Sequence, residues 1–425
     1  MIRLIEALRY RSLRYVSQEV RQFQVLVGPN ASGKSTFLDV PAFLGDLLQG
    51  GLVAAVQGDP KLSIATRAPD PSHLVFLRQG SEFELVVELA IPEERRRGLP
   101  NGGHAVARYE VAIRTEPELG LASETLWLKP ETAPREANPQ GALFPEPPEP
   151  LESIVIAPRR RTPEGWKRVV SRGEDPWNVQ FHSETTGWQN PFRIGPTKSA
   201  LANLPEDELR FPVATWVKRV LGEGIQRVVL SSEAMRRPSP PGRTAAFLPD
   251  GSNLPWVADQ LKRQHPDRFA AWVEHVRTAL TDIEEVSSVE RPEDRHRYLV
   301  LRFRSGLQAP SWLVSDGTLR LLALTLLAYV PEIHGTYLIE EPENGIHPRA
   351  IETVYQSLSS VYDAQVLAAS HSPVVVSMAR PSDMLCFARR SEGATAIVSG
   401  DHHPSLRAWK GKVDLGTLFA GGVLG

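Results

Sequence analysis

Cysteine is almost missing from this chain of 425 residues, which contains only Cys386. A single cysteine excludes a disulfide framework and a cysteine-rich zinc site within the chain. An excess of one charge is lacking too, because 48 lysines and arginines nearly balance 50 aspartates and glutamates, for a formal net charge of −2. The sequence therefore provides no overall attraction to nucleic acid, although it allows a local basic surface.

Long apolar runs are also missing. No uninterrupted stretch approaches the ~20 apolar residues that span a bilayer, and the N-terminus lacks the apolar core of a secretory signal. Hydrophobic residues make up 41% and charged residues 23% of the chain, which excludes collagen, coiled-coil rods and wholesale disorder. We therefore expect a protein without a membrane segment, most simply in the cytoplasm.

Polarity patterns predict an α/β fold. The expected strands are 2–8, 23–27, 82–91, 105–114, 298–303, 336–339 and 365–369, and the expected helices are 316–329 and 349–361. The alternation of strands and helices after residue 297 favours a largely parallel sheet with helices on its faces. Between the two halves, seven prolines in 130–150 exclude a helix or central strand. Helical spacing returns at 196–222 and 252–281, so we predict an inserted, partly helical subdomain at 130–290.

A glycine-rich loop joins the apolar strand 23–27 to a helical pattern. Its residues are Gly28, Pro29, Asn30, Ala31, Ser32, Gly33, Lys34, Ser35 and Thr36. Glycines at this spacing let backbone N–H groups turn toward phosphate oxygens, Lys34 reaches the β- and γ-phosphates, and Ser35 offers a hydroxyl to Mg²⁺. The loop therefore predicts binding of a nucleotide such as ATP together with Mg²⁺.

Two acids, Glu340 and Glu341, end the apolar strand 336–339. Alone they would indicate only a solvated strand end. In an ATPase with a phosphate loop, the first acid binds Mg²⁺ and the second orients or deprotonates the attacking water. Most such strands end in Asp then Glu, and Glu340 adds one methylene of reach. His371 follows the next apolar strand, from where an imidazole can hydrogen-bond the γ-phosphate.

Residues Ser315, Asp316, Gly317 and Thr318 open the helix expected at 316–329. Ser315 is a suitable helix N-cap. The free N–H groups at this helix start could also bind the γ-phosphate of a nucleotide held by another subunit.

These four motifs, in this order, resemble the ABC-type ATPase group that includes SMC, RecF and the ATPase half of OLD-family proteins. The segments 8–13, 25–30 and 250–255 are similar to that group as well. The resemblance covers roughly 1–48 and 297–390, more weakly 250–265, and does not cover 130–245. It implies an ABC-type ATPase head with a mixed parallel and antiparallel sheet, whose N-terminal half is 1–129 and whose C-terminal half is 291–425, with 130–290 as a lid or arm.

The resemblance also implies roles for single residues. Lys34 and Ser35 would bind phosphate and Mg²⁺, Glu340 would bind Mg²⁺, Glu341 would be the catalytic base, and His371 the switch histidine. Ser315 and Gly317 would belong to a signature loop that acts across a homodimer, with two ATP molecules sandwiched head to tail. Transporter ATPases carry Ser-Gly-Gly-Gln at this loop, from which Asp316 and Thr318 depart. The glutamine expected after the first helix is best matched by Gln79.

We therefore predict that the chain hydrolyses ATP and acts as a dimerisation switch. It would regulate a separate effector, a nuclease or toxin, in bacterial anti-phage defence. About fifty residues follow His371, too few for the Toprim nuclease domain of OLD-family proteins, so we expect any nuclease activity to come from another chain. The main alternative is a RecF-like ATPase that grips DNA in repair or chromosome maintenance. A transporter ATPase is disfavoured by the insert and the signature, and a silent ATP-binding scaffold by the intact Lys34, Glu341 and His371.

Three weaker sequence patterns each allow two interpretations. The basic runs Arg95–Arg97 and Arg159–Arg161, with Lys167, Arg168 and Arg172 nearby, could bind a phosphate backbone or form solvated loops. Trp166, Trp177 and Trp188 could stack on bases or pack within the subdomain. The apolar tail, 414–425, could dock on its own domain or on a partner.

Overall fold

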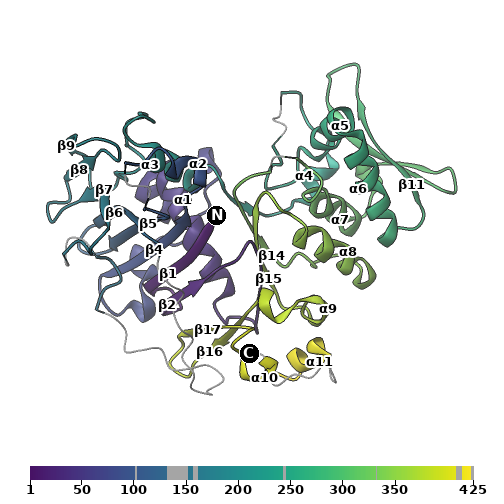
Figure 1. The fold of residues 1–425 in the computed structure, drawn as a ribbon. Coiled ribbons are helices and arrows are strands. Elements are labelled where there is room, and N and C mark those ends of the chain that lie inside the picture. Colours follow the sequence, from purple (N-terminus) through teal and green to yellow (C-terminus); the bar gives the residue numbers. More distant parts are fainter. Residues whose placement is uncertain are drawn as a thin grey trace. The chain divides into compact units, whose positions relative to one another are not determined.

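A computed structural model describes residues 1–100, 103–131, 152–156, 161–242, 246–331, 333–407 and 414–422. The chain forms two compact units, whose elements are labelled in Figure 1. The first unit comprises Met1–Arg21, Pro29–Ile225 and Cys386–Arg407, and the second comprises Gln22–Gly28, Gln226–Leu385 and Ala408–Gly425. The prediction of three parts at 1–129, 130–290 and 291–425 stays a prediction.

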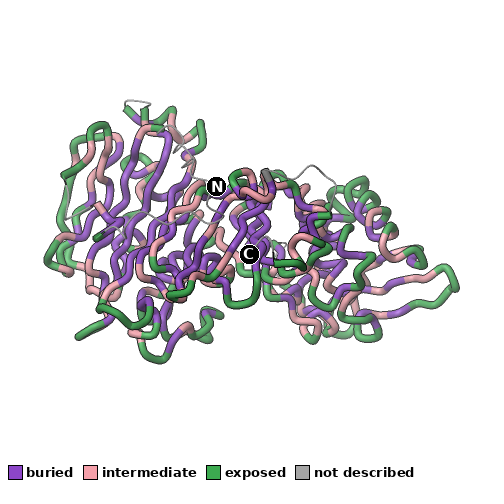
Figure 2. The backbone as a smooth tube through the Cα atoms, turned by 90° about the horizontal axis from the view of Figure 1, so that it is seen from below, coloured by how far each residue is buried: buried purple, intermediate pink, exposed green. Residues whose placement is uncertain are grey.

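The first unit is built on an eight-stranded sheet in the order β2-β1-β4-β5-β6-β7-β8-β9. Each neighbouring pair is antiparallel. The strands are β1 (Ile2–Tyr10), β2 (Leu13–Glu19), β4 (Glu82–Ala90), β5 (Val106–Arg114), β6 (Gly120–Lys129), β7 (Lys167–Arg172), β8 (Asn178–His182) and β9 (Gln189–Arg193). Figure 2 draws much of this sheet in the buried colour. The strands expected at 82–91 and 105–114 are confirmed as the antiparallel pair β4–β5.

Helix α1 (Lys34–Gln57) packs against one face of this sheet. Phe43 of α1 meets Tyr10 and Phe83 with ring centroids 6.0 and 5.8 Å apart. By length and composition α1 could cross a membrane, but 67% of its most apolar 18-residue window is buried. Such burial is what the core helix of a globular unit shows. Helix α3 (Pro212–Gly222) packs on α1, and the remaining short helices of this unit are α2 (Glu93–Arg96), η1 (Pro60–Leu62), η2 (Pro71–Leu74), η3 (Phe76–Arg78) and α10 (Pro404–Arg407).

The other face of the sheet carries buried carboxylates that hold residues 152–156. Glu84 Oε2 accepts from the backbone N–H of Ile154 at 2.7 Å and of Val155 at 3.2 Å. Glu110 Oε2 accepts from the N–H of Ile156 at 3.0 Å, and Arg108 donates to the carbonyl of Ile154. Because successive side chains of a strand point to opposite faces, Phe83 faces α1 while Glu84 faces this segment. Side chains therefore take the place of a strand pairing here.

Glu184 caps the N-terminus of α3 with a buried carboxylate. Its two oxygens accept from the backbone N–H groups of Val213 and Ala214, each at 2.7 Å. Burial raises the pKa of Glu184 from 4.5 to about 7, although these two hydrogen bonds and nearby Lys167 lower it. Loss of water around the carboxylate thus outweighs the helix cap.

This raised pKa predicts a pH-dependent stability. The folded state holds the Glu184 proton more tightly than the unfolded state, so the stabilisation is full below pH 4.5 and is lost as the pH rises through about 7. Between pH 5 and pH 8 the wild type should lose roughly 2–3 kcal/mol of unfolding free energy more than Glu184→Gln. Urea unfolding at both pH values measures this. Glu174→Gln, at an exposed position, is the control, and equal pH slopes for wild type and Glu184→Gln would contradict the prediction.

The second unit contains a parallel sheet that receives the strand preceding the phosphate loop. Strand β3 (Phe23–Val27) pairs with β15 (Gln365–Ser370), which pairs with β14 (Thr336–Glu340), both parallel. β10 (Ile225–Val228) flanks β14. Beyond β15 the chain enters α9 (Pro373–Met378) and η5 (Pro381–Asp383). The strands β16 (Met384–Arg389) and β17 (Thr395–Ser399) follow, and from Cys386 onward they belong to the first unit. The parallel sheet predicted from the later β/α alternation is confirmed.

Helices cover the rest of the second unit. They are α4 (Ser232–Arg236), α5 (Leu254–Gln264), α6 (Pro266–Ala279), α7 (Asp316–Leu326), α8 (Pro348–Ser359) and α11 (Leu415–Ala420), with the turn η4 (Ser311–Leu313). α5 and α6 pack on the antiparallel sheet of β11 (Ile283–Glu290), β12 (Arg297–Phe303) and β13 (Gln308–Pro310). Buried Trp272 of α6 donates to Thr325 Oγ1 of α7 at 2.9 Å. The described tail, 414–422, docks on its own unit through α11 and α9.

The helical expectations hold with one correction. The helices at 316–329, 349–361 and 252–281 are confirmed as α7, α8 and the pair α5–α6. At 196–222 only 212–222 is helical, and 196–211 forms turns. The chain there is bound by its backbone to buried Glu124, which accepts from the N–H groups of Ala200 and Leu201. Such side-chain bonds satisfy backbone donors outside a helix.

Candidate nucleotide site

The phosphate loop lies between β3 and α1, as the sequence predicts. Gly28 is buried, Asn30 and Ser35 are exposed, and Gly33, Lys34 and Thr36 are half-buried. α1 begins at Lys34, so the positive end of a helix that continues as far as a break at Gly51 opens at the loop. This is the arrangement that anions favour.

Two polar groups of the loop suit an anionic ligand. The Lys34 ammonium turns back to the carbonyl of Pro29 at 2.9 Å, which keeps the charge over the loop. The Ser32 hydroxyl is buried and has no hydrogen-bond partner among the described residues. An unsatisfied buried hydroxyl costs free energy unless something binds it. The loop therefore fits a phosphate group.

Gly33 is the N-cap of α1 and the position where only glycine fits. Its φ of 100° lies in the left-handed region. A Cβ built there would lie 2.0 Å from Thr395 Oγ1 and 3.0 Å from Ser12 Oγ. The side chains of β17 and of the β1–β2 turn thus press against the glycine, so both backbone conformation and space require this residue.

The candidate base, Glu341, adopts a backbone conformation that is rare for this residue type. It follows β14 with φ of 48°, in the left-handed region. Its N–H donates to the carbonyl of Ala369 in β15 at 2.8 Å. Strained backbone of this kind persists where the surroundings hold it, and it concentrates at functional sites.

The parallel register of β14 and β15 brings Glu341 beside His371. Glu340 is level with Ala369, and both strands end at the same edge. Glu341 Oε1 lies 3.4 Å from His371 Nδ1. The next acid, Glu343, accepts from Ser370 Oγ at 2.7 Å. The structure thus brings Glu341 and His371 together and adds Glu343, which the sequence-based prediction did not assign, while the predicted roles of Glu341 and His371 stay predictions.

The two residues predicted to bind Mg²⁺ are Ser35 and Glu340. Glu340 is exposed at the end of β14, with Arg227 of β10 at 3.8 Å. No group of three or more His, Cys, Asp or Glu residues suited to a metal occurs in the described ranges. Mg²⁺ prefers hard oxygen donors and commonly takes only one or two from protein, the rest coming from phosphate and water. A hydroxyl and a carboxylate therefore fit this ion chemically.

The predicted signature loop opens α7. Ser315 is the N-cap, since its Oγ accepts from Thr318 N at 3.3 Å and donates to Thr318 Oγ1 at 2.8 Å. Gly317 packs directly against the turn that follows Glu341, because a Cβ there would lie 2.3 Å from the carbonyl oxygen of Gly345. The signature loop and the acidic turn therefore contact each other within the second unit.

The basic runs of the first unit are largely engaged in internal contacts. Arg97 pairs with Glu93 at 2.7 Å, Arg95 with Glu208 at 3.6 Å, and buried Arg172 with Glu124 at 3.7 Å. Arg159 and Arg160 lie outside the described residues. These pairs leave less free positive charge for a phosphate backbone than the sequence allows.

Two of the three tryptophans of this unit that the sequence singled out also make internal contacts. Trp166 packs edge-on against Trp127 at 5.9 Å, and Trp188 against Phe211 at the same distance. Trp177 is exposed. The packing interpretation therefore describes two of the three residues. Gln79 is an exposed residue just after η3, and its assignment stays a prediction.

One functional candidate was missed by sequence reasoning, namely Arg236. It ends α4 and contacts the loop before α7. It stands in a proline-rich segment that looks like a boundary, and no motif marks it. Arg236 is identified only by its contact with the loop before α7 in the folded chain.

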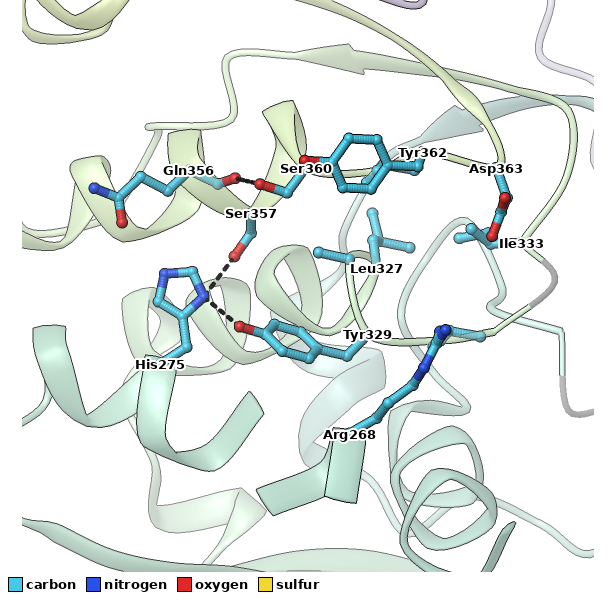
Figure 3. Close-up of a pocket in the computed structure, with 13 residues that line it drawn as sticks. Arg268, His275, Leu327, Tyr329, Ile333, Gln356, Ser357, Ser360, Tyr362 and Asp363 are labelled. Atoms are coloured by element: carbon cyan, nitrogen blue, oxygen red, sulfur yellow. Dashed lines mark hydrogen bonds between the residues drawn. The ribbon is translucent and has the colours of Figure 1, made fainter. Parts of the chain in front are cut away.

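A cavity of about 620 Å³ occupies another part of the second unit, between α6, the end of α7 and the end of α8. Figure 3 shows His275 Nδ1 facing Tyr329 Oη at 2.9 Å and Ser357 Oγ at 3.3 Å. Burial lowers the pKa of His275 and favours its neutral form. None of the predicted site residues lines this cavity.

Comparison with known families finds a match over part of the chain. Residues 171–377 match the family described as "AAA domain, putative AbiEii toxin, Type IV TA system". That match starts after the phosphate loop, so the loop is assigned from its own sequence and geometry. No curated protein is significantly similar to the chain.

Among solved structures, the chain is similar to heads of SMC proteins. A head described as "SmcHead bound to the C-winged helix domain of ScpA" has a TM-score of 0.50 at 14% identity, over 93% of this chain and 96% of that chain. An Smc head from Pyrococcus furiosus, bound to the C-terminal domain of ScpA, has a TM-score of 0.47 at 12% identity, over 93% and 95%. The SMC head domain of Thermotoga maritima has a TM-score of 0.41 at 10% identity, over 94% of this chain and 98% of that chain.

At 14% identity the first of these likenesses shows the fold alone. It extends over nearly the whole chain, while the family match covers the middle and later part. The chain therefore has the fold of an SMC head, and its residues 171–377, just under half of the chain, are similar to the AAA domain family.

Proposed function

We propose that the chain binds ATP with Mg²⁺, hydrolyses it, and uses it to drive head-to-tail association of two copies. The observation that carries this proposal is the acidic turn, where Glu341 is held in left-handed backbone with its carboxylate 3.4 Å from His371. A base in this place, next to a histidine at the neighbouring strand end, suits in-line attack of a water on a γ-phosphate.

Each predicted residue then has a task. Lys34 and the loop N–H groups bind the phosphates and offset their charge as it develops. Ser35 and Glu340 would hold Mg²⁺, which when bound neutralises phosphate charge. Glu341 takes a proton from the attacking water, and His371 positions that carboxylate and senses the γ-phosphate. Ser315 and Gly317 present the start of α7 to the nucleotide held by the second copy.

The biological role we propose is control of a separate effector, a nuclease or toxin, in anti-phage defence in the cytoplasm. The matched family is described as a putative toxin of a type IV toxin–antitoxin system, so the description connects such domains with two-protein systems but names no separate effector. Affinity purification from the native host should recover a nuclease or another toxic protein with the chain. Recovery of DNA-repair proteins instead would contradict this role.

Glu341→Gln tests the ATPase proposal. The amide keeps the shape of the carboxylate but cannot take the proton, so ATP should be bound and not turned over. Light scattering should show a monomer without nucleotide and a dimer with ATP–Mg²⁺. Glu352→Gln, at an exposed position of α8, removes a carboxylate that has no assigned role in the site and should keep most turnover. A Glu341→Gln chain with normal turnover, or one that stays monomeric with ATP, would refute the proposal.

A further inference from the structure

The start of α7 carries an acid where the proposed function needs to bind a phosphate. Asp316 is the first residue of α7, directly after the N-cap Ser315, and its side chain is 55% exposed. A carboxylate is stabilised at a helix N-terminus in an isolated unit. The same negative charge repels the γ-phosphate of an arriving nucleotide. The loop therefore needs a compensating cation.

Arg236 provides that cation and contacts the loop on both sides of Ser315. Its guanidinium lies 2.5 Å from Asp316 Oδ1 and donates to the carbonyl of Val314 at 3.1 Å. Its own carbonyl accepts from Ser311 Oγ at 3.2 Å, and Ser311 is fully buried. The backbone of Arg236 is thus fixed to the turn before α7, while its side chain spans the signature loop.

The energetic contribution of the Arg236–Asp316 ion pair depends on whether water reaches it. The side chain of Arg236 is 37% exposed, so water screens the ion pair in the separate chain, where such pairs contribute little. A second copy with bound nucleotide would exclude that water. Without that water, the Asp316 carboxylate would repel the γ-phosphate strongly unless Arg236 neutralised its charge.

We propose that Arg236 is a positioning residue of the composite site. It neutralises Asp316 and holds Val314, so that the N-terminus of α7 accepts the γ-phosphate of the nucleoside triphosphate bound to a second copy. This inference rests on the proposed function. The guanidinium does not take part in bond cleavage.

The test uses the full chain carrying Glu341→Gln as parent, with ATP–Mg²⁺ and light scattering over a range of protein concentrations. In about 50 mM salt, Arg236→Gln should weaken the ATP-dependent dimer at least about 10-fold, because Asp316 is left uncompensated. Adding Asp316→Asn to the same chain should restore dimerisation to within about threefold of the parent. In about 500 mM salt the defect of Arg236→Gln should largely persist, because charges inside a closed interface are screened little. Arg237→Gln, which removes an exposed arginine paired with Glu233, is the matched control and should match the parent.

Thermal unfolding separates positioning from folding. Arg236→Gln should lower Tm by no more than about 2 °C, since an exposed ion pair stabilises the chain little. A double variant as weak as Arg236→Gln would overturn the charge argument, because Arg236 would then act only by holding Val314. Parent-like dimerisation of Arg236→Gln would overturn the inference while leaving the proposed function intact. A parent that stays monomeric with ATP would refute the proposed function and this inference with it.

Discussion

Lys34→Ala is expected to abolish ATP turnover, with a loss of at least about 100-fold in kcat/KM, and to weaken nucleotide binding severely. The Lys34 ammonium lies over the phosphate loop, 2.9 Å from the carbonyl of Pro29. Without it, the loop retains its backbone N–H groups but loses the charge that offsets the β- and γ-phosphates. Phosphate release measures turnover, and titration with a fluorescent ATP analogue measures binding.

The fold should survive this substitution. The side chain of Lys34 is half-buried at the surface of the loop, so circular dichroism and Tm should stay close to the wild type. Lys61→Ala removes an exposed lysine from the same unit and should leave both turnover and binding intact. Wild-type turnover in Lys34→Ala would mean that the phosphate loop does not bind the reacting nucleotide.

Gly317→Ala is expected to lower turnover and ATP-dependent dimerisation by about 100-fold or more while leaving ATP binding in place. A Cβ at Gly317 would lie 2.3 Å from the carbonyl oxygen of Gly345, and real side chains do not tolerate such a contact. Because the obstacle is backbone, either the signature loop or the turn after Glu341 must move. Catalytic geometry is sensitive to displacements of about 1 Å.

Separate measurements of ATP affinity and turnover show whether Gly317→Ala impairs nucleotide binding or a later step. From Pro29 onward the phosphate loop belongs to the first unit and Gly317 to the second, so ATP affinity should remain near the wild-type value. Gly187→Ala is the control, because a Cβ there meets nothing within 4 Å. Gly317→Ala with normal turnover and normal ATP-dependent dimerisation would show that the contact with Gly345 is not needed for function.

Several features of this protein could be predicted from sequence because they depend on neighbouring residues. The phosphate loop needs a strand, glycines at fixed spacing, a lysine and a helix, all within 23–48. The antiparallel pair β4–β5 follows from alternating polarity over two short runs. Ser315 as the N-cap of α7 follows from a hydroxyl at the start of an apolar helix. In each case local backbone geometry limits which residues are suitable.

Other features depended on contacts between distant segments. Glu341 and His371 are thirty positions apart, and the parallel register of β14 and β15 sets their 3.4 Å approach. The same holds for Gly317 against Gly345 and for Arg236 against Asp316. The turns at 196–211 replaced an expected helix because buried Glu124 binds their N–H groups.

The sequence by itself thus determined which residues are the candidates for binding phosphate, metal and water. Only the tertiary structure decided which of them meet, which basic residues are already paired, and that Arg236 pairs with Asp316. The physical reason is that motif residues are selected by short-range backbone geometry, which leaves a repeating pattern. Packing between distant segments depends on register and burial, and these leave no local mark on the sequence.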